Sequence, residues 1–551
     1  MEPHYATIWE GVADAIPAEV ALVQGDVRRT WAAFEDRAAR LAGAFAAAGV
    51  GPGSKVGIFL YNAPEYLEAQ FAALKVRAVP VNVNYRYLDD ELHYLLENAE
   101  AEVLVFHSSL GERVAAVRDR LPALRLLVEV DDGGGHLDGT EPMEDLLAGT
   151  EPAPRIERDP ADITMTYTGG TTGMPKGVMG AIGEAVLALL VSAPPLLGER
   201  PLASPEEAVA LAVRRVAEGR QFVTIAAPPL MHATAMGIAA TPTLLCGGRL
   251  VLLNGRKLDL AELWDAAERE RVNAIVVVGD AFARPMLHEL DAHPGRDLAA
   301  VQVIASSGAM FSHDVKEGLL EHIPQMVIVD LIAATEGTMG MSISAKDHPA
   351  DTARFIPGAG VVVVSEDGRI LEPGSEEVGL VAVPSVGTQG YFKDEAKTAA
   401  TFKEIDGVRY TLPGDFATIG ADGSLSLLGR GSQCINTAGE KVFPEEVEEA
   451  IKLHPGVADA LVFGLPDERF GQRVAAVVGP DDDAAGPIDH EALLADLRTR
   501  LSSYKLPRQL VTVAVVPRSA VGKPDYPEAR RLFEAASVAD GGGNQDPVAD
   551  D

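Results

Sequence analysis

Helix-like and strand-like segments alternate along the first third of this 551-residue chain. Residues 34–50 (FEDRAARLAGAFAAAGV) place apolar side chains at helical spacing and end at a glycine, whereas residues 55–60 (KVGIFL) form a short apolar run typical of a buried strand. The same alternation continues with a helix-like segment at 66–76 and strand-like segments at 79–84, 101–106 and 124–130. Such alternation predicts an α/β fold with doubly wound, mixed sheets covered by helices on both faces.

The pattern changes between residues 358 and 428, where short strand-like runs are joined by Asp-Gly turns. This change predicts antiparallel structure, as a small β-barrel-like part of a large N-terminal domain. After a boundary near LGRGSQ, helices and strands alternate again over about 100 residues, which predicts a small mobile α+β domain. We therefore expect an N-terminal domain at 1–430, a C-terminal domain at 431–533 and a disordered acidic tail at 534–551.

The formal net charge of −34 argues against nucleic-acid binding, which needs a basic surface, and against an anionic membrane surface. The chain has two cysteines, Cys246 and Cys434, so a disulfide framework is excluded and a reducing, cytoplasmic location is expected. The N-terminus does not resemble a signal peptide, and the apolar run at 185–197 is too short to span a bilayer. The sequence leaves open whether the protein contacts a membrane peripherally and whether it forms a homodimer.

Residues 167–179 (YTGGTTGMPKGVM) form a loop rich in glycine and threonine that ends in a lysine. Glycines let the backbone approach an anion, and N–H groups with Thr hydroxyls donate hydrogen bonds to phosphate oxygens. The spacing differs from that of a P-loop, because Lys176 follows Pro175 and precedes Gly177, with no hydroxyl placed to hold Mg²⁺. The segment predicts a phosphate-binding loop of another kind; the alternative is a plain glycine turn.

Four further polar positions follow this loop in a fixed order. Thr335 and Glu336 come after the strand-like MVIVDLI, and a carboxylate beside a hydroxyl can bind Mg²⁺ and contact a phosphate. Asp415 can accept both hydroxyls of a ribose, Arg430 stands at the expected domain boundary, and Lys523 lies in a Gly-Lys-Pro loop. Each has an ordinary alternative, since Thr-Glu pairs often cap helices and Gly-Asp is often a turn.

Taken together, this order resembles the adenylate-forming superfamily of acyl-CoA synthetases, luciferases and peptide-synthetase adenylation domains, over residues 10 to 530. TYTGGTTGMPKGV is highly specific for that superfamily. The stretches APPLMHATA, VVVGDAFARPML, YTLPGDFA and GEKVFPEEVE resemble the bacterial branch of fatty-acyl- and steroid-side-chain-CoA ligases. The resemblance implies ATP, Mg²⁺ and coenzyme A as reactants and cofactors, and a small-molecule carboxylate as substrate.

The resemblance also implies roles for individual residues. Thr335 would contact the α-phosphate, Glu336 would bind Mg²⁺, Asp415 would accept the ribose hydroxyls with support from Arg430, and Lys523 would bridge the acyl carboxylate and the α-phosphate. The β- and γ-phosphates would be held by Thr168, Gly169, Gly170, Thr171, Thr172, Gly173 and Lys176. Ser307, Gly308 and Ala309 would lie beside the adenine, and the pantetheine tunnel would be faced by Ala438, Gly439 and Lys441. The acyl pocket would include His232, Met231, Met236, Gly337 and Met339.

Two positions depart from the family pattern. Relatives usually carry Asp or Lys where this chain has Ser432, which with Gly431 is the expected pivot for rotation of the small domain. Many relatives place an aromatic residue and a glycine before the Thr-Glu pair, whereas this chain has Ile332 and Ala333. The adenine would then pack on an aliphatic surface with less stacking.

The implied activity is that of an ATP-dependent acyl-CoA ligase. A carboxylate first attacks ATP to give an acyl-adenylate and pyrophosphate, and the thiol of coenzyme A then displaces AMP. Small residues and methionines near the expected pocket favour a medium- or long-chain fatty acid or a steroid side-chain acid, although these residues could equally belong to the core. The alternatives are an aryl or other carboxylate substrate, an adenylation enzyme that loads a carrier protein, a luciferase-like oxygenase and a non-catalytic sensor.

Overall fold

The computed structural model describes residues 1–168, 174–348, 354–430, 433, 435–437, 440–467, 471–481, 486–501, 503–519 and 523–539. The chain forms two compact units. The first comprises Met1–Thr352 and Val383–Thr411, and the second comprises Ala353–Ala382 and Leu412–Asp551. The first unit therefore includes residues 383–411, which the sequence pattern placed in the antiparallel part. The predicted domain limit at 430/431 lies within the second unit, and residues 431 and 432 are outside the described part.

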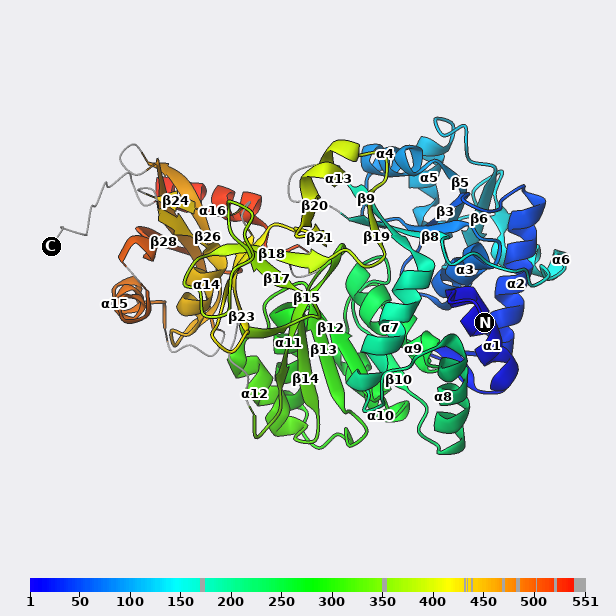
Figure 1. Ribbon diagram of the computed structural model, residues 1–551, viewed down its shortest axis with the longest axis horizontal. Coiled ribbons are helices and arrows are strands. Elements are labelled where there is room, and N and C mark those ends of the chain that lie inside the picture. The colour runs from blue at the N-terminus through cyan, green and yellow to red at the C-terminus, as the bar shows by residue number, and fades with distance from the viewer. Residues whose placement is uncertain are drawn as a thin grey trace. The chain divides into compact units, whose positions relative to one another are not determined.

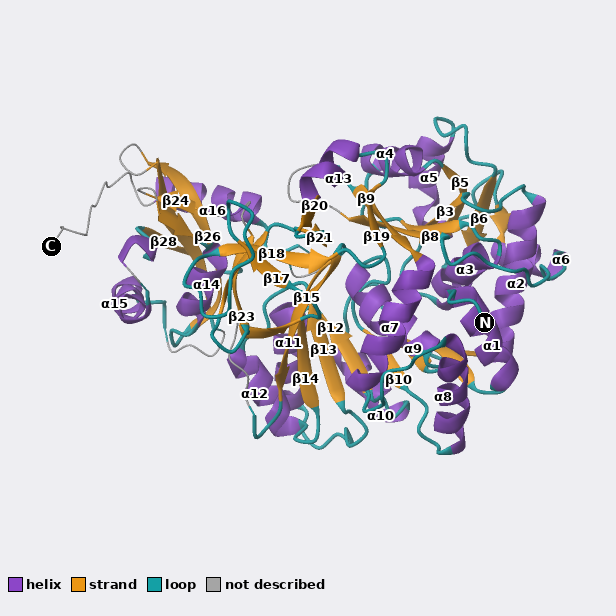
Figure 2. Cartoon of the chain, viewed as in Figure 1, coloured by secondary structure: helices purple, strands orange, loops and turns teal. Residues whose placement is uncertain are grey.

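The first unit contains two mixed sheets (Figures 1 and 2). In sheet order, the strands of the first are β2 (Val27–Thr30), β1 (Val20–Gln24), β11 (Arg249–Leu252), β10 (Val223–Ala226), β12 (Ala274–Val277), β13 (Val303–Ser307), β14 (Val327–Ala334) and β15 (Gly337–Ser344). Those of the second are β19 (Thr388–Tyr391), β9 (Lys176–Ala181), β8 (Ile163–Thr168), β4 (Val79–Asn82), β3 (Lys55–Phe59), β5 (Ala101–His107), β6 (Leu126–Val130) and β7 (Glu141–Pro142). The first sheet is parallel in the centre and antiparallel at both edges, β1–β2 and β14–β15. The second is parallel from β8 to β7 and antiparallel where β9 and β19 are added. This mixture of parallel and antiparallel strands confirms the predicted fold class.

Three groups of helices cover the faces of these sheets. Between the sheets pack α1 (Tyr5–Ala15), α2 (Trp31–Ala47), α3 (Pro64–Lys75), α7 (Ile182–Leu196), α8 (Pro205–Ala217) and α9 (Thr241–Leu245). The other face of the first sheet is covered by α10 (Leu260–Arg269), α11 (Gly279–Ala292) and α12 (His313–His322). The other face of the second sheet is covered by α4 (Asp89–Ala99) and α5 (Gly111–Arg118). The remaining elements are α6 (Met143–Gly149), α13 (Glu395–Thr401), the 3₁₀ turn η1 (Ser108–Leu110), β20 (Phe402–Ile405) and β21 (Val408–Thr411).

This layering explains why the central strands read as unbroken apolar runs. In β5, Val103 and Val105 join the core between the sheets, whereas Leu104 and Phe106 join the core under α4 and α5. Successive side chains of a strand point to opposite faces, so a strand that is buried on both faces must be apolar at every position.

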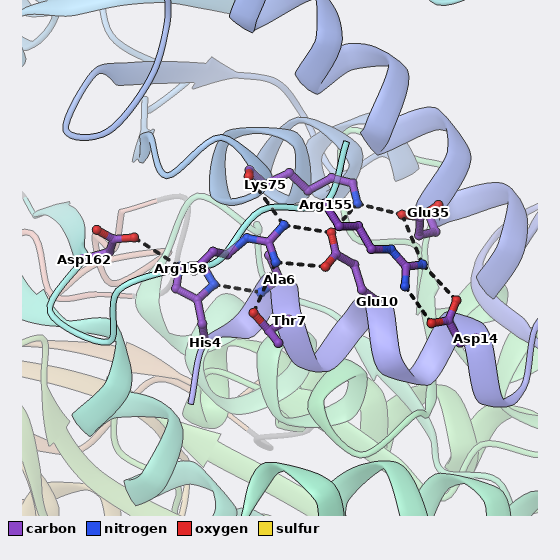
Figure 3. Close-up of polar contacts among 10 residues, drawn as sticks. All are labelled: His4, Ala6, Thr7, Glu10, Asp14, Glu35, Lys75, Arg155, Arg158 and Asp162. Atoms are coloured by element: carbon purple, nitrogen blue, oxygen red, sulfur yellow. Dashed lines mark hydrogen bonds and ion pairs between the residues drawn. The ribbon is translucent and has the colours of Figure 1, made fainter. Parts of the chain in front are cut away.

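A buried group of charged side chains ties α1 to the rest of the first unit (Figure 3). The Glu10 carboxylate accepts hydrogen bonds from Arg158 Nη1 and Nη2, both at 2.8 Å, and from Lys75 Nζ at 2.7 Å. Lys75 also donates to Glu35 on α2 at 2.7 Å. Burial would raise the pKa of Glu10, but hydrogen bonds and charges from Arg158 and Lys75 outweigh burial and lower this pKa. The carboxylate is thus held in its ionised form.

The second unit consists of antiparallel strands followed by a small α+β sheet. The antiparallel strands are β16 (Arg354–Pro357), β17 (Val362–Val364), β18 (Gly379–Pro384), whose last two residues belong to the first unit, β22 (Asp415–Ile419) and β23 (Leu425–Arg430). The small sheet has the order β25 (Glu440–Val442), β24 (Ile435–Thr437), β27 (Gly471–Pro480) and β26 (Val457–Asp467), with β28 (Gln509–Thr512) paired to β27. It is accompanied by α14 (Pro444–Lys452), α15 (His490–Arg500), the 3₁₀ turn η4 (Ser503–Lys505) and α16 (Tyr526–Ala539).

The C-terminal helix corrects one sequence prediction. The acidic tail was expected to begin at residue 534, but α16 continues to Ala539. Ala529 and Phe533, one helical turn apart, are buried against the small sheet, and the alanine-rich residues that follow favour continuation of the helix. Residues 540–551 lie outside the described part. No helix in the described ranges is long and apolar enough to cross a membrane.

Candidate functional site

The two ends of the predicted phosphate loop lie opposite each other. Thr168 is the last residue of β8, Lys176 is the first residue of β9, and the two are partners in the antiparallel pair. The Lys176 ammonium is 2.5 Å from a carboxylate oxygen of Asp394, at the N-cap of α13. A hydrogen bond from Lys176 lowers the pKa of this carboxyl group. The loop residues between the strands lie outside the described part: Gly169, Gly170, Thr171, Thr172 and Gly173.

The predicted adenine segment lies at the carboxyl edge of the first sheet. Ser307 is the last residue of β13 and pairs with Leu331 of the parallel strand β14. Gly308 has φ +93°, a left-handed conformation that glycine adopts readily, and turns the chain toward Ala309. The carboxyl ends of β10, β12, β13 and β14 meet at this edge. Open α/β sheets bind ligands outside the carboxyl ends of their strands.

Thr335 and Glu336 form the two-residue turn of the hairpin between β14 and β15 at the same edge. Glu336 Oε1 accepts a hydrogen bond of 2.5 Å from the Tyr391 hydroxyl, and the Glu336 carbonyl oxygen accepts one of 3.1 Å from Thr388 Oγ1. Oε2 has no hydrogen-bond partner within the described ranges. One half-buried carboxylate with an open oxygen fits Mg²⁺ in a nucleotide site, where phosphates and waters complete the coordination. No group of three potential metal ligands occurs among the residues that the structure describes.

The predicted acyl-pocket residues separate into core and accessible positions. Met231 is 3% exposed and belongs to the core between the sheets. Met339 is 1% exposed and lies at a buried position of β15. His232 and Met236 are half-buried in the segment after β10. Met236 begins the exposed part of a π-helix, η2 (Ala235–Ala240), a form often found at functional sites.

The neighbouring positions show where space remains. A Cβ atom added at Gly237 would meet no atom within 4 Å, so η2 borders open space there. A Cβ atom added at Gly337 would come within 3.0 Å of Val383, so this glycine is closely packed.

Three residues that the sequence did not single out contact predicted site residues. Asn82, at the end of β4, donates to the carbonyl oxygens of Tyr167 at 2.9 Å and Met231 at 2.7 Å, and accepts from the Tyr167 N–H. It therefore joins the start of the predicted phosphate loop to the predicted acyl-pocket segment. The Tyr391 hydroxyl donates a hydrogen bond to Glu336, and Asp394 accepts one from Lys176. Asp394 resembles an ordinary helix N-cap in the sequence, and the other two carry no distinguishing local pattern.

The predicted ribose-binding residue belongs to the second unit. Asp415 is 5% exposed at the start of β22, directly after Gly414, which has φ +98°. Its partner in the antiparallel pair is Arg430, at the end of β23. The strand register therefore places the two residues opposite each other in the sheet.

The remaining predicted residues also belong to the second unit. Lys523 is exposed, and its backbone is held by Ser519, whose N–H donates to the Lys523 carbonyl at 2.7 Å and whose hydroxyl accepts from the Lys523 N–H at 3.2 Å. Lys441 lies on β25, opposite Asn436 of β24. The other predicted positions, Ala438 and Gly439 and the pivot at Gly431 and Ser432, lie outside the described residues.

Sequence comparison finds relatives that match almost the whole chain. The chain is 39% identical over 538 residues to a 3-oxocholest-4-en-26-oate–CoA ligase of Rhodococcus rhodochrous, covering 96% of this chain and 95% of the relative. It is 38% identical over 540 residues to the medium-chain acyl-CoA ligase Mig of Mycobacterium avium, covering 95% and 96%. A medium/long-chain-fatty-acid–CoA/3-oxocholest-4-en-26-oate–CoA ligase of Mycolicibacterium smegmatis is 39% identical over 547 residues, with 97% of each chain covered.

Solved structures share the fold at lower identity. The anthranilate CoA ligase AuaEII in complex with anthranoyl-AMP superposes with a TM-score of 0.83 at 21% identity, covering 98% of each chain. ATP-bound MatB from Rhodopseudomonas palustris superposes with a TM-score of 0.79 at 23% identity, covering 97% of this chain and 99% of MatB.

Family profiles agree with these relatives. The profile of the AMP-binding enzyme family matches residues 9–392, and that of the AMP-binding enzyme C-terminal domain matches residues 446–523. The resemblance drawn from the Thr- and Gly-rich loop and the residues that follow it is confirmed, as is the prediction of a CoA ligase. This chain belongs to the AMP-binding enzyme family.

Proposed function

We propose that this protein is an AMP-forming acyl-CoA ligase whose substrate is a medium- or long-chain fatty acid or a steroid side-chain acid. The observation that carries the proposal is the identity of 37–39% over 95–97% of the chain to ligases named for these acids. The half-buried Met236 and the open space beside Gly237 are consistent with a roomy apolar pocket. Methionine side chains adapt to ligands of varied shape.

The first half-reaction joins the acid to AMP and releases pyrophosphate. A carboxylate anion must approach a triphosphate, so positive groups and oriented donors have to offset the repulsion. We assign this task to Lys176, to the Thr- and Gly-rich loop and to Lys523, and the contact with the α-phosphate to Thr335. When bound, Mg²⁺ would neutralise part of the phosphate charge, and Glu336 would hold it.

The second half-reaction transfers the acyl group to coenzyme A. The thiol attacks the acyl carbon of the adenylate, and AMP leaves, so no nucleophilic side chain is needed. We propose that a C-terminal domain beginning at residue 431 rotates between the two steps, with its pivot at Gly431 and Ser432. Ser432→Pro should spare adenylate formation and slow thioester formation, and equal loss of both would refute this pivot. The pantetheine-facing roles of Ala438, Gly439 and Lys441, and the adenine-facing roles of Ser307, Gly308 and Ala309, belong to the same proposal.

The direct test is to incubate the purified protein with ATP, Mg²⁺, coenzyme A and separate acids: acetate, hexanoate, palmitate, benzoate and a C24 sterol acid. We expect AMP and acyl-CoA from the longer acids. Lys523→Ala should lower the rate about a hundredfold or more, because it removes a charge that stabilises the transition state. Lys403→Ala, at an exposed lysine of β20, is the matched control and should keep full activity.

The other outcomes separate the alternatives. Preference for benzoate would indicate an aryl acid ligase. This alternative is supported by the similarity to a feruloyl-CoA synthase of Amycolatopsis, which is 32% identical over 529 residues. Acyl-adenylate without thioester would indicate a carrier protein as the acceptor. ADP as the product would refute the proposed reaction. A cytoplasmic location, proposed from cysteine usage, is testable by cell fractionation.

A further inference from the structure

Strand β19 lies between the two groups that we propose to contact the metal-bound triphosphate. On one side it pairs with β9, the strand that begins at Lys176: Tyr391 is the partner of Val178, and the Phe392 N–H donates to the Gly177 carbonyl at 2.8 Å. The position of β19 is therefore set by the strand that carries the phosphate-loop lysine.

On its other side, β19 is bonded twice to the metal-binding candidate. Thr388 donates to the carbonyl oxygen of Glu336 at 3.1 Å, and Tyr391 donates to its carboxylate at 2.5 Å. The Tyr391 ring is 7% exposed and packs edge-on against Phe402, with ring centroids 6.1 Å apart. A buried ring leaves the hydroxyl little freedom, so the bond fixes one oxygen of the carboxylate and directs the other.

The turn after β19 is itself held in place. Thr398 on α13 accepts a hydrogen bond from the Tyr391 N–H at 2.9 Å and donates to the Asp394 carbonyl at 2.8 Å. A Cβ atom added at Gly390 would lie 2.6 Å from the Thr398 side chain, so this close contact requires glycine. Asp394, three residues after Tyr391, holds the Lys176 ammonium. One short segment thus contacts both groups.

We propose that Tyr391 is a positioning residue that holds the Glu336 carboxylate at a fixed place relative to Lys176, so that ATP with its metal meets both groups already arranged. The inference rests on the proposed function. Partners that orient a metal-binding side chain typically change metal affinity 10–100-fold when removed. Arrangement before binding also spares the protein the cost of ordering the site when ATP arrives.

The test compares Tyr391→Phe with Tyr410→Phe. Both tyrosine rings are buried, 7% and 6% exposed, and lie in the same unit, but the Tyr410 hydroxyl is not bonded to Glu336. Calorimetry would give the Kd for ATP with Mg²⁺ and with EDTA. We expect Tyr391→Phe to raise the Kd about tenfold with Mg²⁺ and less than twofold with EDTA, while Tyr410→Phe changes neither.

A double-mutant cycle with Glu336→Gln tests whether the tyrosine acts through the carboxylate. In that background Tyr391→Phe should have no further effect on the Kd with Mg²⁺. Equal weakening with Mg²⁺ and with EDTA, or additive effects in the cycle, would overturn the inference. If the wild-type protein makes AMP and Tyr391→Phe behaves like Tyr410→Phe, the inference alone fails. If the wild-type protein makes no AMP from any acid, the proposed function fails as well.

Discussion

Replacing Glu10 by glutamine should destabilise the first unit far more than replacing Asp14 by asparagine. The two carboxylates lie one turn apart on α1, and each is paired with an arginine through two hydrogen bonds (Figure 3). They differ in burial: the side chain of Glu10 is 6% exposed and that of Asp14 is 61% exposed. The pair of substitutions therefore isolates the effect of burial on an ion pair.

The expected magnitudes follow from the partners that each change leaves behind. Glu10→Gln leaves Arg158 and Lys75, whose side chains are 1% and 3% exposed, without their shared counter-charge. Removing one partner of a buried charge pair costs about 3–5 kcal/mol. Lys75 keeps its bond to Glu35, which places the expected loss near the lower end of that range. Arg155 is 44% exposed, so Asp14→Asn should cost about 1 kcal/mol or less.

Urea unfolding followed by tryptophan fluorescence measures both values. The three tryptophans of the chain, at positions 9, 31 and 264, all lie in the first unit, so the signal reports the unfolding of that unit. We expect the midpoint for Glu10→Gln to fall with an unchanged dependence of the free energy on urea. A loss below about 1 kcal/mol, or a loss equal to that of Asp14→Asn, would show that burial does not decide the strength of these pairs.

Three further predictions concern pH, Lys176 and one glycine. Burial lowers the pKa of His4 to about 4, so the unfolded chain takes up a proton first as the pH falls. The first unit should lose about 3 kcal/mol of stability between pH 6.5 and 4, and His4→Asn, which keeps an acceptor for the cap of α1, should remove that loss in acid titrations. Asp394→Asn keeps the cap of α13 but removes the carboxylate that holds the Lys176 ammonium in place, so the KM for ATP should rise about two- to fivefold in steady-state assays; a fall would show instead that this carboxylate competes with phosphate for Lys176. Gly279→Ala should cost at least about 1 kcal/mol in thermal unfolding, because φ is +48° and the new Cβ would lie 2.1 Å from a backbone oxygen, whereas Gly237→Ala, with no atom within 4 Å of its Cβ, should cost less.

Local patterns were sufficient to predict the fold class and several of the regular elements of the first unit. The apolar run at 55–60 became β3, and the helix-like segment at 34–50 became most of α2. Both rest on side-chain periodicity and on end signals, which depend only on near neighbours in the chain. The order of the polar motifs also led to the family, because the residue types that bind phosphate and a metal stay recognisable without a structure.

Long-range pairing decided what the local patterns could not. Residues 383–411 read as part of the antiparallel region, yet β19 joins the second sheet beside β9, which precedes it by about 200 residues. Nothing in the sequence near Tyr391 marks this partner, because strand propensity does not depend on which strand will be adjacent. The contacts of Tyr391 with Glu336 and of Asp394 with Lys176 follow from that pairing alone.

The difference between local pattern and tertiary packing also applies to the methionines of the predicted acyl pocket. Methionine at positions 231, 236 and 339 suggested one apolar pocket, but packing buries Met231 and Met339 and leaves Met236 half-exposed. Composition states which side chains are apolar, and only the packing of helices and sheets determines which of them remain accessible to a ligand. The sequence thus led to the family and its chemistry, and the tertiary structure determined which residues contact the predicted site residues, because those contacts join segments far apart in the chain.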